Sequence, residues 1–203
     1  CPAVIPWPPG ERNNIMSTYP SRKQARMILD IETTCNPDAV SLMPDPKAPA
    51  NIKDPEKIRA AIEEKRAEQI ANAALDPDYG RILSIGMYNE NLAKPLVVYI
   101  NAEVYPEVKE TEDEHGWLIP LPEAGMLNCF WPEFAACSGY CVGYNVLNFD
   151  LPYLLRRSMA LGVKVPLMPV LAKFRTEPVT DLMMILYNWG ADRYKGLKQV
   201  ARL

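Results

Sequence analysis

Two acidic residues interrupt an apolar run near the start of the chain. Asp30 and Glu32 lie within residues 27–34, whose composition is typical of a buried β-strand. Because residues i and i+2 of a strand point to the same face, we expect the two carboxylates side by side, roughly 7 Å apart along the strand. Acidic residues are rarely buried unless they are paired or bind a metal, so the pattern predicts a divalent-cation site. If the strand instead ended early, Asp30 would be a turn residue and Glu32 a surface residue.

A third carboxylate lies in a second informative segment. Residues 143–155 have the pattern of a strand end, a loop and then a helix that opens at Asp150. On its own, Asp150 could be only the N-cap of that helix, with Pro152 in the first turn. The two segments are more informative as an ordered pair.

Together the two segments resemble the first two motifs of the DEDD superfamily of 3′→5′ exonucleases. These motifs are Asp-x-Glu on the first strand and Asn-x-x-x-Phe-Asp before a helix, here residues 30–32 and 145–150. The stretch Gly-Tyr-Asn…Phe-Asp-Leu-Pro-Tyr is similar to the exonuclease domain of family-B DNA polymerases and to related stand-alone phage and bacterial exonucleases. The resemblance covers about residues 26–203 and implies a ribonuclease-H-like α/β fold, with a mixed sheet flanked by helices.

The resemblance also implies hydrolysis of phosphodiester bonds with two metal ions. Two Mg²⁺ or Mn²⁺ ions lower the pKa of the attacking water and stabilise the in-line transition state, and hard oxygen ligands select these ions. We expect Asp30 to bridge both ions, Glu32 to complete one site and contact the water or the terminal 3′-hydroxyl, and Asp150 to act on the second ion directly or through water.

Three further residues are candidate substrate contacts. By resemblance, Asn145 contacts the 3′-terminal nucleotide, while Thr33 and the backbone after Glu32 contact the terminal sugar. Phe149 supports stacking of a frayed base, a contact worth ~1–3 kcal/mol, unless it is a core residue.

The chain departs from the family pattern at the fourth carboxylate. The superfamily places this residue in Tyr-x-x-x-Asp or His-x-x-x-x-Asp on a late helix. No tyrosine of this sequence has Asp at i+4, and its one histidine, His115, has Pro120 at i+5. We therefore expect the chain to end before the fourth Asp and its general-base Tyr or His, with Tyr favoured by the family-B resemblance. If a residue within the chain took that place, Asp181 would be the first suspect.

The composition is that of an ordinary globular domain. Of the 203 residues, 48% are hydrophobic and 23% are charged, enough for one well-packed domain. No apolar stretch approaches the ~18 residues of a membrane span, and no signal sequence is visible. The five cysteines match no zinc pattern. We expect a cytoplasmic protein of a bacterium or a phage-infected host cell, with reduced thiols, three of them in the core, and with no membrane partner.

The net charge of −3 is unevenly distributed. Residues 156–203 contain nine Lys or Arg and three acidic residues, a balance of +6, so the remainder carries −9. This basic portion could supply contacts to phosphates. Alternatively, its cations are scattered over solvated faces.

The remaining pattern gives an order of elements. We expect residues 1–25 to be a leader or disordered segment, and residues 26–203 to form the exonuclease-like domain, incomplete at its C-terminus. A proline-rich loop at 36–54 leads to a helical insertion at about 54–75, whose thin apolar stripe predicts a position across the domain surface. The pattern then predicts strands at 81–88 and 94–101 joined by a turn at 89–91, an acidic loop at 102–121, a helix at 122–138, a strand at 140–144, and helices at 150–161, at 181–189 and from 197.

Three classes of function fit these observations. The first is a metal-dependent 3′→5′ exonuclease acting on the 3′ end of single-stranded DNA, either stand-alone or proofreading with a DNA polymerase as partner. The second is a catalytically incomplete ribonuclease-H-like module that binds nucleic acid or a polymerase partner. The third, another ribonuclease-H-like nuclease or a recombinase, is disfavoured by the Asn145…Phe149-Asp150 spacing.

Overall fold

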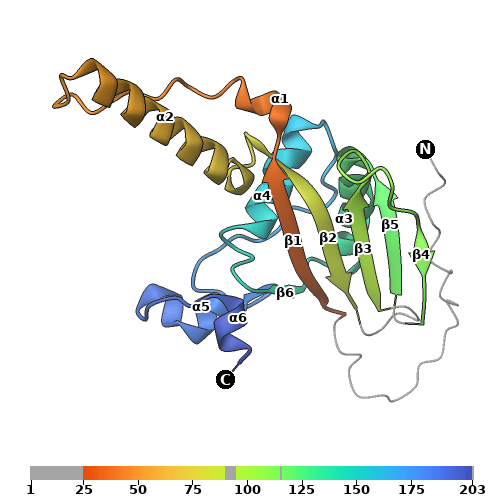
Figure 1. Cartoon of the computed structure of the whole chain (residues 1–203). Coiled ribbons are helices and arrows are strands. Elements are labelled where there is room, and N and C mark those ends of the chain that lie inside the picture. The colour runs from red at the N-terminus through yellow and green to blue at the C-terminus, as the bar shows by residue number, and fades with distance from the viewer. Residues whose placement is uncertain (1–24, 90–94, 115, 203) are drawn as a thin grey trace, which may run out of the picture.

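A mixed β-sheet with helices on its faces forms the body of the protein (Figure 1). The computed structural model describes residues 25–89, 95–114 and 116–202. Within them, seven strands lie in the order β4-β5-β3-β2-β1-β6-β7. Their bounds are β1 Met27–Cys35, β2 Gly80–Tyr88, β3 Leu96–Asn101, β4 Thr111–Glu112, β5 Gly116–Leu121, β6 Cys141–Gly143 and β7 Val179–Asp181.

Strand β1 lies inside the sheet, between one antiparallel and one parallel neighbour. It pairs antiparallel with β2 and parallel with β6, and β6 pairs parallel with β7. The result is an α/β fold consistent with a ribonuclease-H-like arrangement, as predicted. The expected leader up to residue 24, the centre of the expected turn at 90–91, and His115 lie outside the described residues.

The helices α3, Glu123–Ala136, and α4, Asp150–Ala160, pack against the core of the sheet through buried apolar residues. The other helices of the described part are α1 Pro37–Val40, α2 Pro55–Asn72, α5 Leu182–Leu186 and α6 Leu197–Val200, with short 3₁₀ turns at Ala73–Leu75 and Asn188–Gly190. The fully buried apolar residues of α3 include Met126, Leu127, Phe130 and Phe134. None of the described helices combines the length and apolar character that a bilayer crossing requires.

Two predictions about the middle and end of the chain are wrong. The expected acidic loop at 102–121 contains β4 and β5, and β5 pairs parallel with β3 along its whole length. Pro120 and the preceding acidic run hid this strand, because both features are typical of loops. The helix expected at 181–189 ends at Leu186, since Asn188 and Trp189 adopt left-handed φ angles of 45° and 55°.

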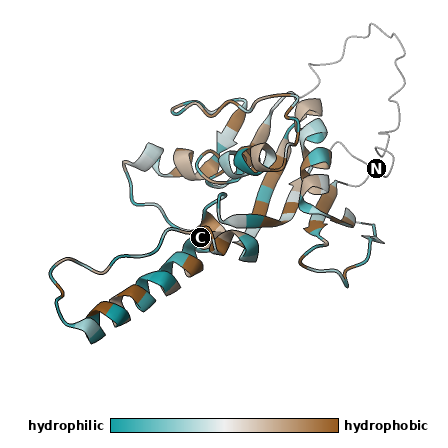
Figure 2. Ribbon diagram, turned by 90° about the horizontal axis from the view of Figure 1, so that it is seen from above, coloured by the Kyte–Doolittle hydropathy of each residue, from teal (hydrophilic) through white to brown (hydrophobic). Residues whose placement is uncertain are grey.

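The helical insertion forms an arm instead of lying across the surface. Asp54 caps α2 by accepting hydrogen bonds from the amides of Glu56 and Lys57. However, none of the 18 described residues of α2 is buried, and the helix projects from the body (Figure 1 and Figure 2). Without an apolar face, α2 has nothing to bury against the sheet.

The proline-rich segment runs outward beside α2 and pairs with it through polar contacts. Gln69 donates to the Pro44 carbonyl, and Arg66 forms an ion pair with Asp45. A groove of about 590 Å³ lies between the segment and α2. Of the four described cysteines, only Cys137 and Cys141 are buried, so the expectation of three core thiols is not met among them.

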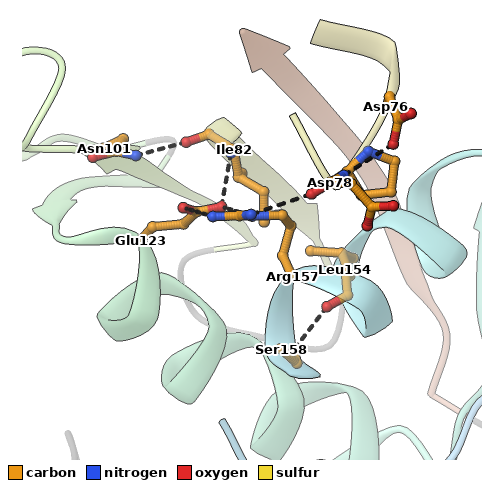
Figure 3. A network of polar contacts seen from close by, with 9 residues as sticks. Asp76, Asp78, Ile82, Asn101, Glu123, Leu154, Arg157 and Ser158 are labelled. Atoms are coloured by element: carbon orange, nitrogen blue, oxygen red, sulfur yellow. Dashed lines mark hydrogen bonds and ion pairs between the residues drawn. The ribbon is translucent and has the colours of Figure 1, made fainter. Parts of the chain in front are cut away.

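A buried ion pair connects α3, α4 and β2 (Figure 3). The Arg157 guanidinium donates two hydrogen bonds of 2.8 Å to the Glu123 carboxylate. The same carboxylate accepts from the Ile82 amide, and Arg157 also donates to the Pro77 carbonyl. Both charged side chains are less than a tenth exposed. Each therefore depends on the other to compensate for lost hydration.

We predict that Arg157→Met destabilises the fold by ~3–5 kcal/mol, because it leaves the Glu123 charge buried without a partner. The adjacent Arg156 offers a matched control, since its ion pair with Asp78 is half exposed. Arg156→Met should cost less than ~1 kcal/mol. Urea unfolding of both variants measures the difference. Equal losses would contradict the role given to the buried pair.

Candidate active site

Asp30 and Glu32 lie on the open face of β1. Along this strand Met27, Leu29 and Ile31 are buried, whereas Asp30 and Glu32 are exposed. The prediction that both carboxylates share one face is therefore confirmed, but that face is open and not buried. The pairing of β1 with β2 shifts register between Glu32 and Thr33. Such irregularities turn side chains locally and are frequent beside functional sites.

Asp150 reaches the same strand from the first turn of α4. Its side chain is buried, with 4% exposure. One carboxylate oxygen, Oδ1, accepts a 3.0 Å hydrogen bond from the amide of Ile31. Ile31 lies between Asp30 and Glu32, so this hydrogen bond holds the third acidic side chain at the segment that carries the first two.

The electrostatics of this region favour a proton or a cation. Burial, and then the charge of Asp30, raise the pKa of Asp150 to about 7, although the Ile31 hydrogen bond lowers it. Partial burial and the neighbouring Glu32 raise the pKa of Asp30. Crowded carboxylates with raised pKa values are frequent at functional sites, because the function supplies the missing positive charge.

The described residues do not form a ready-made metal cage. Within residues 25–89, 95–114 and 116–202, no group of three or more His, Cys, Asp or Glu side chains could hold a metal ion. Carboxylate oxygens are nonetheless the donors that Mg²⁺ and Mn²⁺ prefer. The two-ion site stays a prediction from the sequence.

The loop between β6 and α4 carries the candidate substrate residues. Asn145 is half-buried and adopts a left-handed φ of 67°, and its carbonyl accepts from the Phe149 amide. The Phe149 ring is half-buried and lies 5.5 Å from the Tyr153 ring. Gly143 is needed where the loop begins, because a Cβ there would lie 3.0 Å from the Leu29 carbonyl oxygen.

Thr33, the other candidate substrate residue, stands on β1 directly after the register shift. Its side chain is half-buried. The structure thus brings Asp30, Glu32, Thr33 and Asp150 to one end of α4, and Asn145 and Phe149 lie on the loop that leads into that helix.

Asp181 holds this loop in place. Its side chain is 1% exposed. Its two carboxylate oxygens accept from four backbone amides, those of Asn145, Leu147, Met183 and Met184. With both oxygens engaged by the backbone, Asp181 is poorly suited to the role of a fourth metal ligand. Asp181 is the N-cap residue of α5, and its bonds to the distant loop left no signal in the sequence.

Comparison with known proteins gives a distant structural similarity. The chain is similar to the structure of the family B DNA polymerase from the hyperthermophilic archaeon Pyrobaculum calidifontis, with a TM-score of 0.38 and 16% sequence identity. The match covers 76% of this chain and 14% of that polymerase. No family model and no curated protein matches the sequence.

The raised pKa of Asp150 predicts a specific pH dependence of stability. The folded state holds this proton more tightly than the unfolded chain, whose Asp pKa is about 3.9. Without metal, the folded state therefore loses stability as pH rises from about 4 to about 7, and the loss is complete above that range.

Asp150→Asn removes this loss. In EDTA, its melting temperature relative to the parent should rise between about pH 5 and about pH 8. Asp192→Asn, at an exposed carboxylate, is the control and should follow the parent at both pH values. If the difference in melting temperature between Asp150→Asn and the parent is the same at both pH values, Asp150 titrates normally.

Proposed function

We propose that this protein is a metal-dependent 3′→5′ exonuclease that hydrolyses phosphodiester bonds at the 3′ end of single-stranded DNA, in the cytoplasm of a bacterium or an infected host cell. The observation that carries the proposal is the hydrogen bond from the Ile31 amide to Asp150. It joins a buried carboxylate of raised pKa to the strand segment that presents Asp30 and Glu32.

The residues present fit Mg²⁺ or Mn²⁺ in their chemistry. Asp30 would contact both ions of a pair, Glu32 would complete one site and Asp150 the other. The raised pKa values of Asp30 and Asp150, caused first by burial and then by a neighbouring carboxylate, support cation binding, because a cation would relieve the repulsion between the negative charges. When bound, such ions lower the pKa of the attacking water and neutralise charge on the transition state.

The substrate contacts come from the strand and the loop around these carboxylates. Asn145 would hydrogen-bond the 3′-terminal nucleotide, and Thr33 the terminal sugar. The half-buried Phe149 ring would give a frayed base a surface on which to stack. We propose these roles for a stand-alone enzyme or for a proofreading unit that acts with a DNA polymerase.

A binding module is the second candidate. One observation favours it: among the described residues, no group of three or more His, Cys, Asp or Glu side chains is arranged to hold a metal ion. The 203 residues also contain no Tyr-x-x-x-Asp or His-x-x-x-x-Asp motif that would supply a general base. Loss of a positioned general base typically lowers a rate 10²–10⁴-fold, so we expect hydrolysis by this chain to be slow.

We predict that the chain, in excess over a 5′-labelled single-stranded oligonucleotide, produces a descending ladder of products in Mn²⁺ and none in EDTA. Asp30→Asn and Asp150→Asn should each abolish the ladder, because each removes a negatively charged ligand of the ions. The exposed Asp192→Asn is the matched carboxylate control and should leave the ladder unchanged. Binding of the oligonucleotide without any ladder would favour the binding module.

Asn145 is tested by a pair of substitutions. Glycine tolerates the left-handed φ of 67°, whereas alanine there costs about 1–2 kcal/mol of stability. Asn145→Gly should therefore keep the parent melting temperature and yet raise KM for single-stranded ends, because no side chain remains to hydrogen-bond the substrate. Asn145→Ala should raise KM equally and also lower the melting temperature. An unchanged KM in both variants would exclude the proposed role of Asn145.

A further inference from the structure

An aromatic pair lies on the surface of the C-terminal part of the chain. Phe174 is 75% exposed, although large aromatic rings are normally covered. Its ring centroid lies 5.3 Å from that of Trp189, with an angle of 48° between the rings. Trp189 is itself half-buried against the core. Trp189 therefore supports one side of the Phe174 ring, and the rest of the ring is open to solvent.

The backbone holds both rings in unusual conformations. Phe174 and Trp189 have left-handed φ angles of 61° and 55°. This region is uncommon for residues other than glycine, and bulky side chains are rarer there than Asn or Asp. Such conformations persist only where the surrounding structure imposes them, and they gather at functional sites.

A second aromatic contact links this pair to the loop that carries Asn145. The rings of Tyr187 and Tyr194 meet edge to face, with centroids 5.9 Å apart. Tyr187 is two residues from Trp189, and Tyr194 directly precedes Lys195. The Lys195 carbonyl accepts a hydrogen bond from the hydroxyl of Tyr144, the neighbour of Asn145 in the chain. Two ring contacts, one hydrogen bond and the short chain segments between them thus link Phe174 to the loop that carries Asn145.

Cations flank the aromatic residues in the same way twice. Phe174 lies between Lys173 and Arg175, and Tyr194 lies between Arg193 and Lys195, all in exposed positions. By contrast, Arg156 and Arg157 at the start of the basic portion are engaged in ion pairs with acidic residues of the body.

The acidic residues nearby do little to cancel this charge. Glu177 forms a 2.7 Å ion pair with Arg26, and Asp181 is buried among backbone amides. Asp192 is exposed, as is Glu177. Positive charge therefore exceeds negative charge around the aromatic rings.

We propose that residues 173–175 and 193–195, together with Trp189, form a binding surface for single-stranded nucleic acid. Unpaired bases stack on Phe174, and the flanking cations contact phosphates. A duplex presents no free base faces, so the surface selects single strands. The proposal rests on the proposed function in one respect: the strand bound at this surface is the one whose 3′ end reaches the loop of Asn145.

The test measures binding of a 5′-fluorescein-labelled oligothymidylate of about 12 nucleotides by anisotropy, in EDTA so that no hydrolysis occurs. Phe174→Ala should weaken binding about 5-fold or more, and Phe174→Leu should match it because leucine has no π-face. Phe174→Tyr should restore the parent affinity. Tyr105→Ala, at an aromatic residue exposed to 38% beyond β3, is the matched control and should bind like the parent.

The cations are tested through the salt dependence. For Lys173→Gln/Arg175→Gln, the slope of log affinity against log salt should fall by about 0.7 for each phosphate that the protein no longer neutralises. Oligouridylate in parallel distinguishes DNA from RNA as the bound strand, and either one supports the surface. The proposal is overturned if Phe174→Ala binds with the parent affinity and the salt slope of Lys173→Gln/Arg175→Gln equals that of the parent. The aromatic surface would then be a candidate site for a protein partner.

The result is separable from that of the proposed function. A parent protein that binds through this surface but gives no ladder in Mn²⁺ contradicts the exonuclease and keeps the surface. A parent that produces the ladder, while Phe174→Ala and the double variant bind as the parent does, contradicts the surface alone. A parent that does not bind the oligonucleotide overturns the surface.

Discussion

The hydrogen bond between the Ile31 amide and Asp150 is the contact on which the candidate site depends. It ties the first turn of α4 to strand β1 at the position between Asp30 and Glu32. Its energetic setting is unfavourable, because burial and the charge of Asp30 both oppose ionisation of Asp150. A fold that keeps a buried carboxylate in such a place gives up stability there, which is the pattern expected where a function requires the charge.

Asp181 shows how the surroundings decide what a buried carboxylate does. Four backbone amides satisfy its two oxygens and join the loop of Asn145 to the start of α5. For Asp150, one amide comes from β1, and its neighbours include the charges of Asp30 and Asp181. The first residue acts as a structural acceptor, and the second is left with a raised pKa and a demand for positive charge. Asp181 thus supports the loop of Asn145, whereas Asp150 belongs to the candidate site.

The sequence predicted the parts of the fold that depend on local patterns. An apolar run identified β1, and the two-residue period of a strand placed Asp30 and Glu32 on one face. The starts of α2 and α4 were also predicted close to their observed positions, although Phe149 and not Asp150 is the N-cap residue of α4. The sequence pattern missed β5, whose Pro120 and acidic neighbours are typical of a loop, because the pairing with β3 is a long-range contact. The direction of α2 and the bonds of Asp181 to Asn145 are also tertiary features. The motifs named the residue types of a metal site, but residue types do not fix the distances on which a ligand set depends.

The central claim is that Asp30, Glu32 and Asp150 hold catalytic metal ions. Crystals soaked in Mn²⁺ and measured near the manganese absorption edge test it most directly, because the anomalous signal locates the ion independently of activity. We expect a peak at a coordination distance of about 2.1 Å from an Asp30 oxygen, with Glu32 or Asp150 as a second protein ligand. Full occupancy of Mn²⁺ elsewhere, with no peak at Asp30 under saturating conditions and at a pH above about 7 where Asp150 is ionised, would contradict it.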